Sequence, residues 1–228
     1  MEQMHTLTPL WVLEHCSDST QRRFLEFGKT ISCKKGTFCL RTGEPNDHIF
    51  FLLEGKAAVY NLTSCGKRKI LFVLGRHSMV NESLTGAVST IYCETLERSR
   101  FFLIRRELLL SLMEQDFGLT RTLLQYQEKK IWRLEHQLKN TIGSIYLERK
   151  LASKLWKLAR DFGIPSGKGI LIDMELSITF LADLLGAPRE TTSRVCRKLS
   201  DQGLIVLEKK KIYIPDPEKI SRFYKTIP

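Results

Sequence analysis

The sequence has no apolar run of about 18 residues, the length needed to span a bilayer. Its first residues, MEQMHTLTPLWVLEHC, lack the order of basic, apolar and small residues that marks a secretory signal. We therefore expect a cytoplasmic protein with no membrane partner.

Signatures of metal centres and of catalysis are missing as well. The six cysteines include no Cys-x-x-Cys spacing, which argues against a zinc ribbon or a thioredoxin-type site. The five histidines include no His-x-His pair, and neither a Gly-x-Ser-x-Gly motif nor a phosphate loop occurs. An enzyme on a β-barrel scaffold of the cupin kind would need clustered metal ligands in its strands. The sequence therefore does not predict an enzyme.

What the sequence has in excess is positive charge. The formal net charge is +11 and the pI is near 9.5, which favours a polyanionic partner. The excess is denser in residues 146–228 than before them. A chain of 228 residues with 43% hydrophobic and 27% charged residues suits one large or two modest globular domains.

The most informative stretch is residues 177–199, SITFLADLLGAPRETTSRVCRKL, which predicts two short helices around a tight turn. Ser177 suits a helix N-cap, and Gly186 falls where a helix end needs a left-handed residue. Pro188 is predicted to open the second helix at its first position. Apolar residues recur at helical spacing in the first helix, at Ile178, Leu181, Leu184 and Leu185.

The second helix carries side chains that can read DNA. Arginine matches the O6 and N7 acceptors of guanine, and glutamate can accept from the amino group of cytosine. In a helix-turn-helix, the N-terminal part of the second helix reaches the base edges. The alternative is an ordinary helical hairpin with a solvated charged face. The candidate DNA-binding residues here are Arg189, Glu190, Thr191, Thr192, Ser193, Arg194 and Arg197.

Residues 1–115 predict a β-rich domain after a short N-terminal helix. Short apolar runs punctuated by glycine are typical of a barrel or sandwich, and a double-sheet jelly roll fits best. The predicted strands are 38–40, 49–53, 57–62, 70–74, 91–93 and 101–104.

Residues 116–145 predict one long helix with an apolar seam. Residues spaced by seven form the seam of a coiled coil, so an identical helix is the simplest partner and a two-fold dimer follows. The alternative is that the helix only packs on its own barrel. Gly143 and Ser144 are the expected hinge. The predicted dimer interface contains Phe117, Leu124, Ile131, Leu134 and Leu138, and the seven-residue repeat continues to Ile145.

Residues 146–228 predict the DNA-binding domain. An amphipathic helix over 147–161, a loop over 162–168 and a strand over 170–174 lead into the two-helix stretch. A hairpin follows it, with strands at 205–207 and 212–215. Its basic tip, Lys209, Lys210 and Lys211, is suited to phosphate contacts that add affinity without sequence information.

This order of elements, together with RETTSR at residues 189–194, resembles the Crp/Fnr family of bacterial transcription regulators over roughly residues 20–215. The resemblance implies an α+β chain with an N-terminal β-roll like a cyclic-nucleotide-binding domain, a long dimerisation helix and a C-terminal winged helix-turn-helix. It also implies that Arg189 and Arg194 contact guanines and Glu190 a cytosine in a bent inverted-repeat site. RNA polymerase is the further partner that it implies.

The resemblance also implies a small-molecule effector bound in the roll. Where cyclic-nucleotide members have Gly-Glu, this chain has Asn81-Glu82, and no arginine follows in residues 83–90 to pair with a cyclic phosphate. Cyclic AMP is therefore disfavoured. The expected effector-binding residues are Asn81, Glu82, Ser89, Thr90, Tyr92, Trp132, Glu135 and His136.

Several other effectors remain open at this stage. The run IYCETLERSRFFLI resembles the branch that senses halogenated aromatic acids, so an aromatic or other organic acid is favoured. An iron–sulfur centre would need Cys16, Cys33, Cys39 and Cys93, which look too dispersed. Haem would need an axial ligand such as His48, His77 or His136. The alternative function is a cyclic-nucleotide-binding regulatory protein that acts through protein contacts alone.

Overall fold

The computed structural model describes residues 10–139 and 147–225, and it divides into two compact units. The first groups Met1–Tyr60 with Phe72–Gln137, and the second groups Asn61–Leu71 with Leu138–Pro228. No helix in the described part of the chain is long and apolar enough to cross a membrane.

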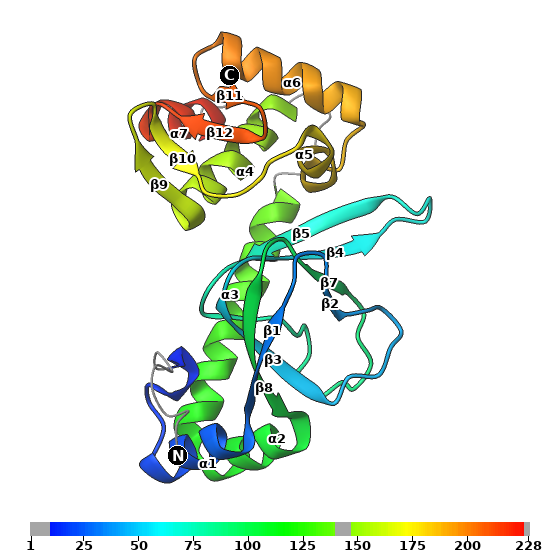
Figure 1. Cartoon of the computed structure of the whole chain (residues 1–228), viewed down its shortest axis with the longest axis vertical. Coiled ribbons are helices and arrows are strands. Elements are labelled where there is room, and N and C mark those ends of the chain that lie inside the picture. Colours follow the sequence, from blue (N-terminus) through cyan, green and yellow to red (C-terminus); the bar gives the residue numbers. More distant parts are fainter. Residues whose placement is uncertain (1–9, 140–146, 226–228) are drawn as a thin grey trace. The chain divides into compact units, whose positions relative to one another are not determined.

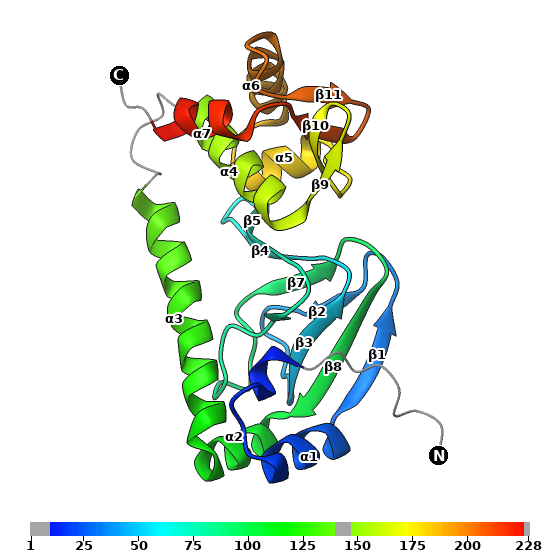
Figure 2. The same cartoon turned by 90° about the vertical axis from the view of Figure 1, so that its left-hand side faces the viewer.

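The first unit is a roll of two antiparallel sheets flanked by helices (Figures 1 and 2). The end of β4 and most of β5 are strands of this roll, although Asn61–Leu71 group with the second unit. One sheet has the strand order β1-β8-β3-β6 and the other β2-β7-β4-β5. The predicted double-sheet roll is confirmed, and the structure adds β1 and β6. The elements in chain order are η1 (Trp11–Leu13), α1 (Asp18–Phe27), β1 (Lys29–Cys33), β2 (Phe38–Leu40), β3 (His48–Glu54), β4 (Ala57–Leu62), β5 (Arg68–Leu74), β6 (Ser78–Met79), β7 (Tyr92–Thr95), β8 (Ser99–Arg105), α2 (Arg106–Gln115) and α3 (Phe117–Lys139).

Strands β3 and β8 are buried on both faces, which explains their unbroken apolar runs. Successive side chains of a strand point to opposite faces. Phe50 and Leu52 of β3 join the cluster that contains residues of both sheets, whereas Ile49 and Phe51 join the cluster that also contains helix residues. The same alternation holds in β8, where Phe101 and Leu103 separate from Phe102 and Ile104. The sheet of β3 and β8 is therefore the middle layer of the unit.

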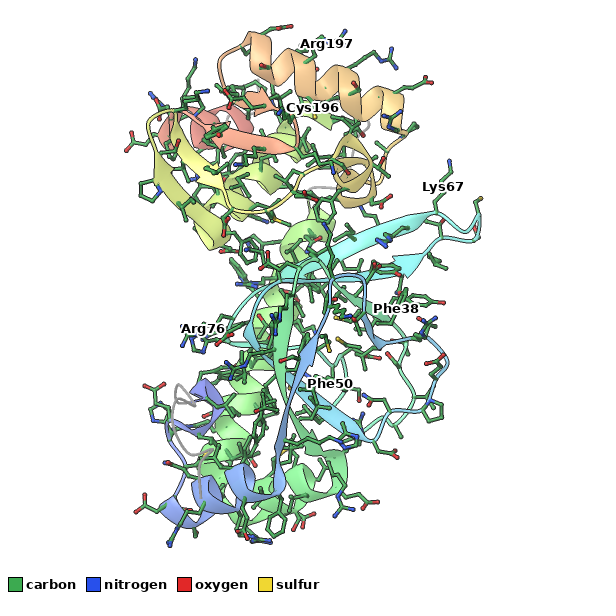
Figure 3. The ribbon with its side chains drawn as sticks, viewed as in Figure 1. Phe38, Phe50, Lys67, Arg76, Cys196 and Arg197 are labelled. Carbon is green, nitrogen blue, oxygen red and sulfur yellow. The ribbon has the colours of Figure 1, made fainter. Side chains whose placement is uncertain are left out.

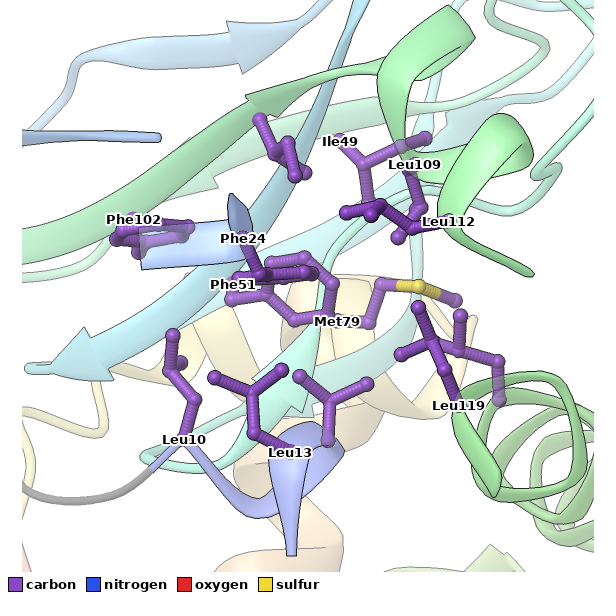
Figure 4. Packing of buried hydrophobic residues seen from close by; sticks show 13 residues of the cluster. Leu10, Leu13, Phe24, Ile49, Phe51, Met79, Phe102, Leu109, Leu112 and Leu119 are labelled. Carbon is purple, nitrogen blue, oxygen red and sulfur yellow. The ribbon is translucent and has the colours of Figure 1, made fainter. Parts of the chain in front are cut away.

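Aromatic packing ties helix α1 to this middle layer (Figure 4). The Phe24 ring stacks on Phe102 with centroids 5.3 Å apart and lies 5.7 Å from the ring of Phe51. All three side chains are essentially inaccessible to solvent. Burying an aromatic side chain of this kind contributes about 1.5–3 kcal/mol, so α1 is held mainly by Phe24.

Helix α3 has two apolar faces with different surroundings. Leu119 and Leu123 are fully buried in the helix-side cluster. The seven-residue seam lies on another side, where Phe117, Leu124 and Ile131 are 74%, 51% and 56% exposed. Packing on the roll and the seam are thus both present, on separate faces. Of the remaining seam positions, Leu134 is exposed, and the side chain of Leu138, the hinge candidates Gly143 and Ser144, and Ile145 lie outside the described residues.

The second unit contains three helices around a small sheet, with a fourth helix at its end (Figure 1). The sheet has the order β11-β12-β10-β9 and all its pairs are antiparallel. The elements are α4 (Leu147–Phe162), β9 (Gly163–Ser166), β10 (Gly169–Ile172), α5 (Ile178–Leu185), α6 (Arg189–Asp201), β11 (Val206–Glu208), β12 (Lys211–Ile214) and α7 (Pro217–Lys225).

Two local predictions in this unit are wrong. Residues 162–168 are not a loop, because Gly163–Ser166 form β9 and pair with β10, with Ile170 opposite Pro165. Proline is tolerated there because β9 is an edge strand. Pro188 is the N-cap residue of α6, with φ −57° and ψ 147°, and helical residues begin at Arg189.

Asp116 joins the starts of two helices in the first unit. Its Oδ2 accepts hydrogen bonds from Ser17 N and Ser17 Oγ, both at 2.9 Å, at the start of α1. Its Oδ1 accepts from Gly118 N at 2.9 Å and Leu119 N at 3.3 Å, in the first turn of α3. Partial burial acts to raise the pKa of this carboxyl, but the hydrogen bonds outweigh it and lower the pKa from 3.8 to about 2.

We expect Asp116→Ala to lower the free energy of unfolding by about 1 kcal/mol near neutral pH, the usual cost of losing a helix cap. A carboxyl with a lowered pKa stabilises the fold fully above its unfolded value of 3.8, and this contribution is lost as the pH falls towards 2. The difference between wild type and variant should therefore shrink below about pH 3.8. Urea unfolding followed by circular dichroism measures it. Glu114→Ala, an exposed carboxylate two residues earlier, is the control and should change little. A pH-independent difference would contradict the assignment.

Candidate nucleic-acid interface and ligand site

The turn between α5 and α6 follows from local sequence. Ser177 Oγ accepts from Phe180 N at 3.1 Å and caps α5. Gly186 ends the helix in the left-handed conformation at φ 74°, and its amide donates to Ala182 O at 2.7 Å. Apolar residues on the inner side of α5, Leu181, Leu184 and Leu185, hold it in the unit.

Helix α6 separates its packing side chains from its polar ones. Its inward residues are Val195, Cys196 and Leu199, all buried. Figure 3 shows Cys196 towards the interior of the unit and Arg197 pointing away from it. The outward face carries exposed Arg189, Glu190, Arg194 and Arg197, with Thr191 and Ser193 half-buried beside them. Arg194 Nη2 donates to Thr191 Oγ1 at 3.5 Å.

Thr192 does not belong to the outward face. Its side chain is 0% exposed, and its hydroxyl donates to Pro188 O at 3.0 Å. The same carbonyl accepts from the Thr192 amide at 2.9 Å, so Thr192 fixes the first turn of α6 from inside. Among the candidate residues predicted on α6, it therefore has a packing role.

The Cys196 thiol, also on α6, lies in an environment that makes it unreactive. Its side chain is 1% exposed, and burial raises its thiol pKa from 9.0 to about 11. A thiol reacts mainly as the thiolate, so this environment makes Cys196 an inert part of the interior.

The basic hairpin predicted after α6 is formed by β11 and β12. Lys209, in the turn between them, has a positive φ of 56° and an exposed side chain. Lys210 and Lys211 are exposed too, and Lys210 Nζ lies 3.8 Å from Glu175 Oε2. Lys168, beside the hairpin, pairs with Glu208. The tip therefore offers ammonium groups from one turn, as phosphate contacts require.

In the first unit, Asn81 holds the backbone of β3. Its Oδ1 accepts from Phe50 N at 2.8 Å, and its Nδ2 donates to His48 O at 3.0 Å. The side chain is 2% exposed. Asn81 was predicted to bind the effector. In the structure its side chain is used to hold its own segment, and thus the adjacent Glu82, against β3.

Glu82 accepts hydrogen bonds from Ser89 and Thr90, two of the predicted effector contacts. Its Oε1 accepts from Thr90 N at 2.6 Å and from Ser89 Oγ at 3.1 Å. Asn81, Glu82, Ser89 and Thr90 thus form one connected group of four residues that the sequence analysis named as effector contacts. The carboxylate is already supplied with donors from this chain.

Helix α3 meets this group through residues that sequence reasoning missed. Lys130 Nζ donates to Asn81 O at 3.0 Å, and Gln127 Nε2 donates to Glu82 O at 3.3 Å. Burial lowers the pKa of the Lys130 ammonium, while the nearby Glu82 carboxylate and Cys93 act to raise it. The three-residue spacing of Gln127 and Lys130 places them on one helical face and was the available signal.

The other predicted helix residues lie elsewhere on α3. Trp132, Glu135 and His136 are exposed, and the ring centroids of Trp132 and His136 are 3.9 Å apart. Trp132 is two residues beyond Lys130 and so about 200° further round the helix. It therefore does not share the face that contacts residues 81 and 82. Tyr92, predicted as a further effector contact, stacks on Tyr60 with ring centroids 5.2 Å apart.

The candidate metal ligands are distributed as follows. In the described part of the chain, no group of three His, Cys, Asp or Glu could hold a metal ion. His48 is half-buried on β3, and His77 and His136 are exposed. Cys16 packs in the helix-side core, whereas Cys33, Cys39 and Cys93 lie together between the sheets.

Two family models match the chain, one to each part. Residues 30–116 match the cyclic nucleotide-binding domain, and residues 149–223 match the Crp-like helix-turn-helix domain. This combination defines a transcription regulator with an effector-binding domain and a DNA-binding domain.

Whole-chain relatives agree with this class. The chain is 27% identical over 184 residues to the global nitrogen regulator of Nostoc sp., covering 79% of this chain and 82% of that one. It is 25% identical over 194 residues to the CRP-like cAMP-activated global transcriptional regulator of Mycobacterium tuberculosis, covering 84% and 86%. The structure of FixK2 from Bradyrhizobium japonicum has the same fold, with a TM-score of 0.76, 19% identity and coverage of 88% and 99%. The chain belongs to the Crp/Fnr family of transcription regulators.

Proposed function

We propose that this protein is a dimeric, sequence-specific DNA-binding regulator controlled by a small organic anion bound in the β-roll. The observation that carries the DNA-binding part is the outward face of α6, where Arg189, Glu190 and Arg194 are exposed together. These residue types match the major-groove edges of guanine and cytosine.

The DNA site follows from two-fold symmetry. A dimer presents two copies of α6, so its site is an inverted repeat with half-sites about one helical turn apart. Lys209 and its neighbours contact phosphates and position the helix. Bending of the DNA brings further backbone contacts, and RNA polymerase is the protein partner at the promoter.

The seam of α3 supports the dimer. Leu124 and Ile131 are large apolar side chains that stay more than half exposed in the single chain, seven residues apart. Pairing with an identical helix removes both from water and needs no other partner.

The effector is an anion because the cation that contacts the ligand segment is the half-buried Lys130. An ammonium group whose pKa is lowered by burial gains most from an anionic partner. The relative from Mycobacterium tuberculosis is named as cAMP-activated. This chain differs from the pattern for cyclic nucleotides, since residues 83–90 contain no arginine and Glu82 is bonded to Ser89 and Thr90. An organic acid, aromatic or aliphatic, suits the site better than cyclic AMP.

Control by the effector requires unequal affinity for two states of the dimer. An acid that binds the DNA-competent state more tightly shifts the population towards it, and DNA tightens the acid by the same factor. Through Lys130 and Gln127, the helix that carries the seam bonds directly to the backbone of Asn81 and Glu82.

The DNA-binding proposal is tested by selection of bound sequences from random duplex DNA. We expect an inverted repeat with G·C pairs at matching half-site positions. With that operator, Arg194→Ala should lose about 1–3 kcal/mol of discrimination at one base pair in each half-site. Fluorescence anisotropy with single-base variants of the operator measures this loss.

The matched control is Arg160→Ala, which removes an exposed arginine from α4 and should leave discrimination unchanged. If selection yields no motif with or without candidate acids, or if Arg194→Ala keeps the full base preference, the assignment of α6 as the reading helix fails.

Ile131→Glu should convert the dimer to a monomer, since it places a charge at the centre of the seam. Sedimentation velocity reports the mass directly. Phe27→Glu, on an exposed apolar residue of α1, is the control and should stay dimeric. A wild-type protein that sediments as a monomer at micromolar concentration would refute the dimer.

Lys130→Gln should weaken binding of the stabilising acid by about 10- to 100-fold, the effect of losing a hydrogen bond to a charged group. A thermal-shift screen of carboxylic acids finds the acid, and calorimetry then compares the variants. Lys129→Gln, the exposed neighbour, keeps the same net charge change and should bind normally. Stabilisation by cyclic AMP alone, or acid binding that ignores Lys130, would contradict the proposal.

A further inference from the structure

Three cysteines that are far apart in the sequence meet between the two sheets of the roll. Cys33 ends β1, Cys39 lies in β2 and Cys93 lies in β7. Cys93 is fully buried in the inter-sheet core, and Cys33 and Cys39 are partly buried against the same core. The three thiols therefore occupy one region of the roll, with Cys39 accessible from solvent in part.

The register of β2 and β7 places Cys39 beside Cys93. The two strands are antiparallel neighbours, with Phe38 opposite Glu94 and Leu40 opposite Cys93. The register shifts between residues 38 and 40, so Cys39 sits at the irregular step, next to the residue that faces Cys93. Neighbouring strands lie about 4.7–4.9 Å apart, so a thiol at this step of β2 is within one strand spacing of β7.

The thiols are hydrogen-bonded to one another through Cys39. Its side chain bonds to Cys93 and also to Cys33. The bond with Cys93 is the main cause that lowers the pKa of Cys39 below 9.0, whereas the same contact raises that of Cys93. Cys39 is thus the thiolate former of the group. Cys16 and Cys196, without such partners in the described structure, have thiol pKa values raised to about 11, mainly by burial.

We propose that Cys39 and Cys93 are a peroxide-reactive thiol pair that forms a reversible disulfide between β2 and β7. Cys39 is the thiol that reacts with peroxide, because it is partly exposed and Cys93 is buried. Cys93 resolves the product, because it lies on the adjacent strand.

The chemistry balances with hydrogen peroxide as the oxidant. The Cys39 thiolate attacks one peroxide oxygen, the O–O bond breaks, and hydroxide leaves and takes up a proton, giving a sulfenic acid and water. The Cys93 sulfur, losing its proton, then attacks the sulfenic sulfur, and the hydroxyl group leaves as the second water. Two thiols lose two electrons and peroxide gains them.

Such a disulfide would join β7, the strand that follows Ser89 and Thr90, to β2. Residues 89 and 90, which bond to Glu82, come directly before β7, and Cys93 is the second residue of that strand. Cys93 is also among the groups that influence the Lys130 ammonium. The disulfide therefore lies beside the residues that contact the proposed effector.

The test is mass mapping of the full-length protein after treatment with one equivalent of hydrogen peroxide in native buffer. Free thiols are blocked with iodoacetamide, and the protein is digested without reduction. We expect a peptide pair linked through Cys39 and Cys93, absent from untreated protein and lost on adding dithiothreitol. Cys65, exposed at the tip of the β4–β5 hairpin, should remain alkylatable, and neither Cys65 nor the buried Cys196 should be linked.

Variants separate the roles of the thiols. Cys93→Ser should leave a sulfenic acid at Cys39 that dimedone traps, whereas Cys65→Ser should behave as wild type. A linkage between Cys33 and Cys39 as the main product would overturn the assignment of Cys93. An unmodified Cys39 in the wild-type protein would overturn the proposal as well, and this result does not depend on whether any variant folds. Oxidation in guanidinium should lose the preference for the Cys39–Cys93 pair, which shows whether the fold sets it.

Discussion

The burial of β3 and β8 on both faces is the constraint on which the first unit depends. Ile49 and Phe51 must face the helices while Phe50 and Leu52 face the opposite sheet. A slip of one residue would exchange the two sets, so the register is strongly specified. The same register positions residues 78–82, because Phe50 N donates to Asn81 Oδ1 and β6 pairs with β3. Tyr126 of α3 donates to Met79 O at 3.1 Å and accepts from Met79 N, which fixes the helix to that segment.

Features with a local period could be predicted from the sequence. The apolar runs of β3 and β8, the cap at Ser177 and the left-handed Gly186 each depend on neighbouring residues, and the structure contains all of them. The described seam positions Phe117, Leu124, Ile131 and Leu134 are exposed, as a seam requires. What depends on long-range pairing could not be predicted. β9 forms because β10 pairs with it, and the thiols converge through strands β1, β2 and β7. The contact between Lys130 and Asn81 could not be predicted either, because it depends on which face of α3 meets residue 81.

Helix α6 shows why residue type alone cannot assign a reading surface. Thr191, Thr192 and Ser193 are similar in size and polarity, yet only Thr192 is buried, with its hydroxyl bonded to Pro188 O. The proline cap has no side-chain acceptor for the first turn, and Thr192 ties that turn to the Pro188 carbonyl from inside. Thr192 therefore belongs to the packed side of α6, whereas the arginines lie exposed on the opposite face.

Helix α3 combines three tasks on different faces, and this arrangement gives the proposed control a physical route. Leu119 and Leu123 anchor the helix to the roll, while Leu124 and Ile131 form the exposed seam. Lys130 adjoins Ile131 in sequence and contacts the ligand segment. Lys130 and Ile131 are neighbours in one hydrogen-bonded helical frame, so the proposed anion would bind to the same helical segment that carries the seam. In the proposed function, the effector and the second chain would therefore both bind to α3, which offers the differential contact that a population shift requires.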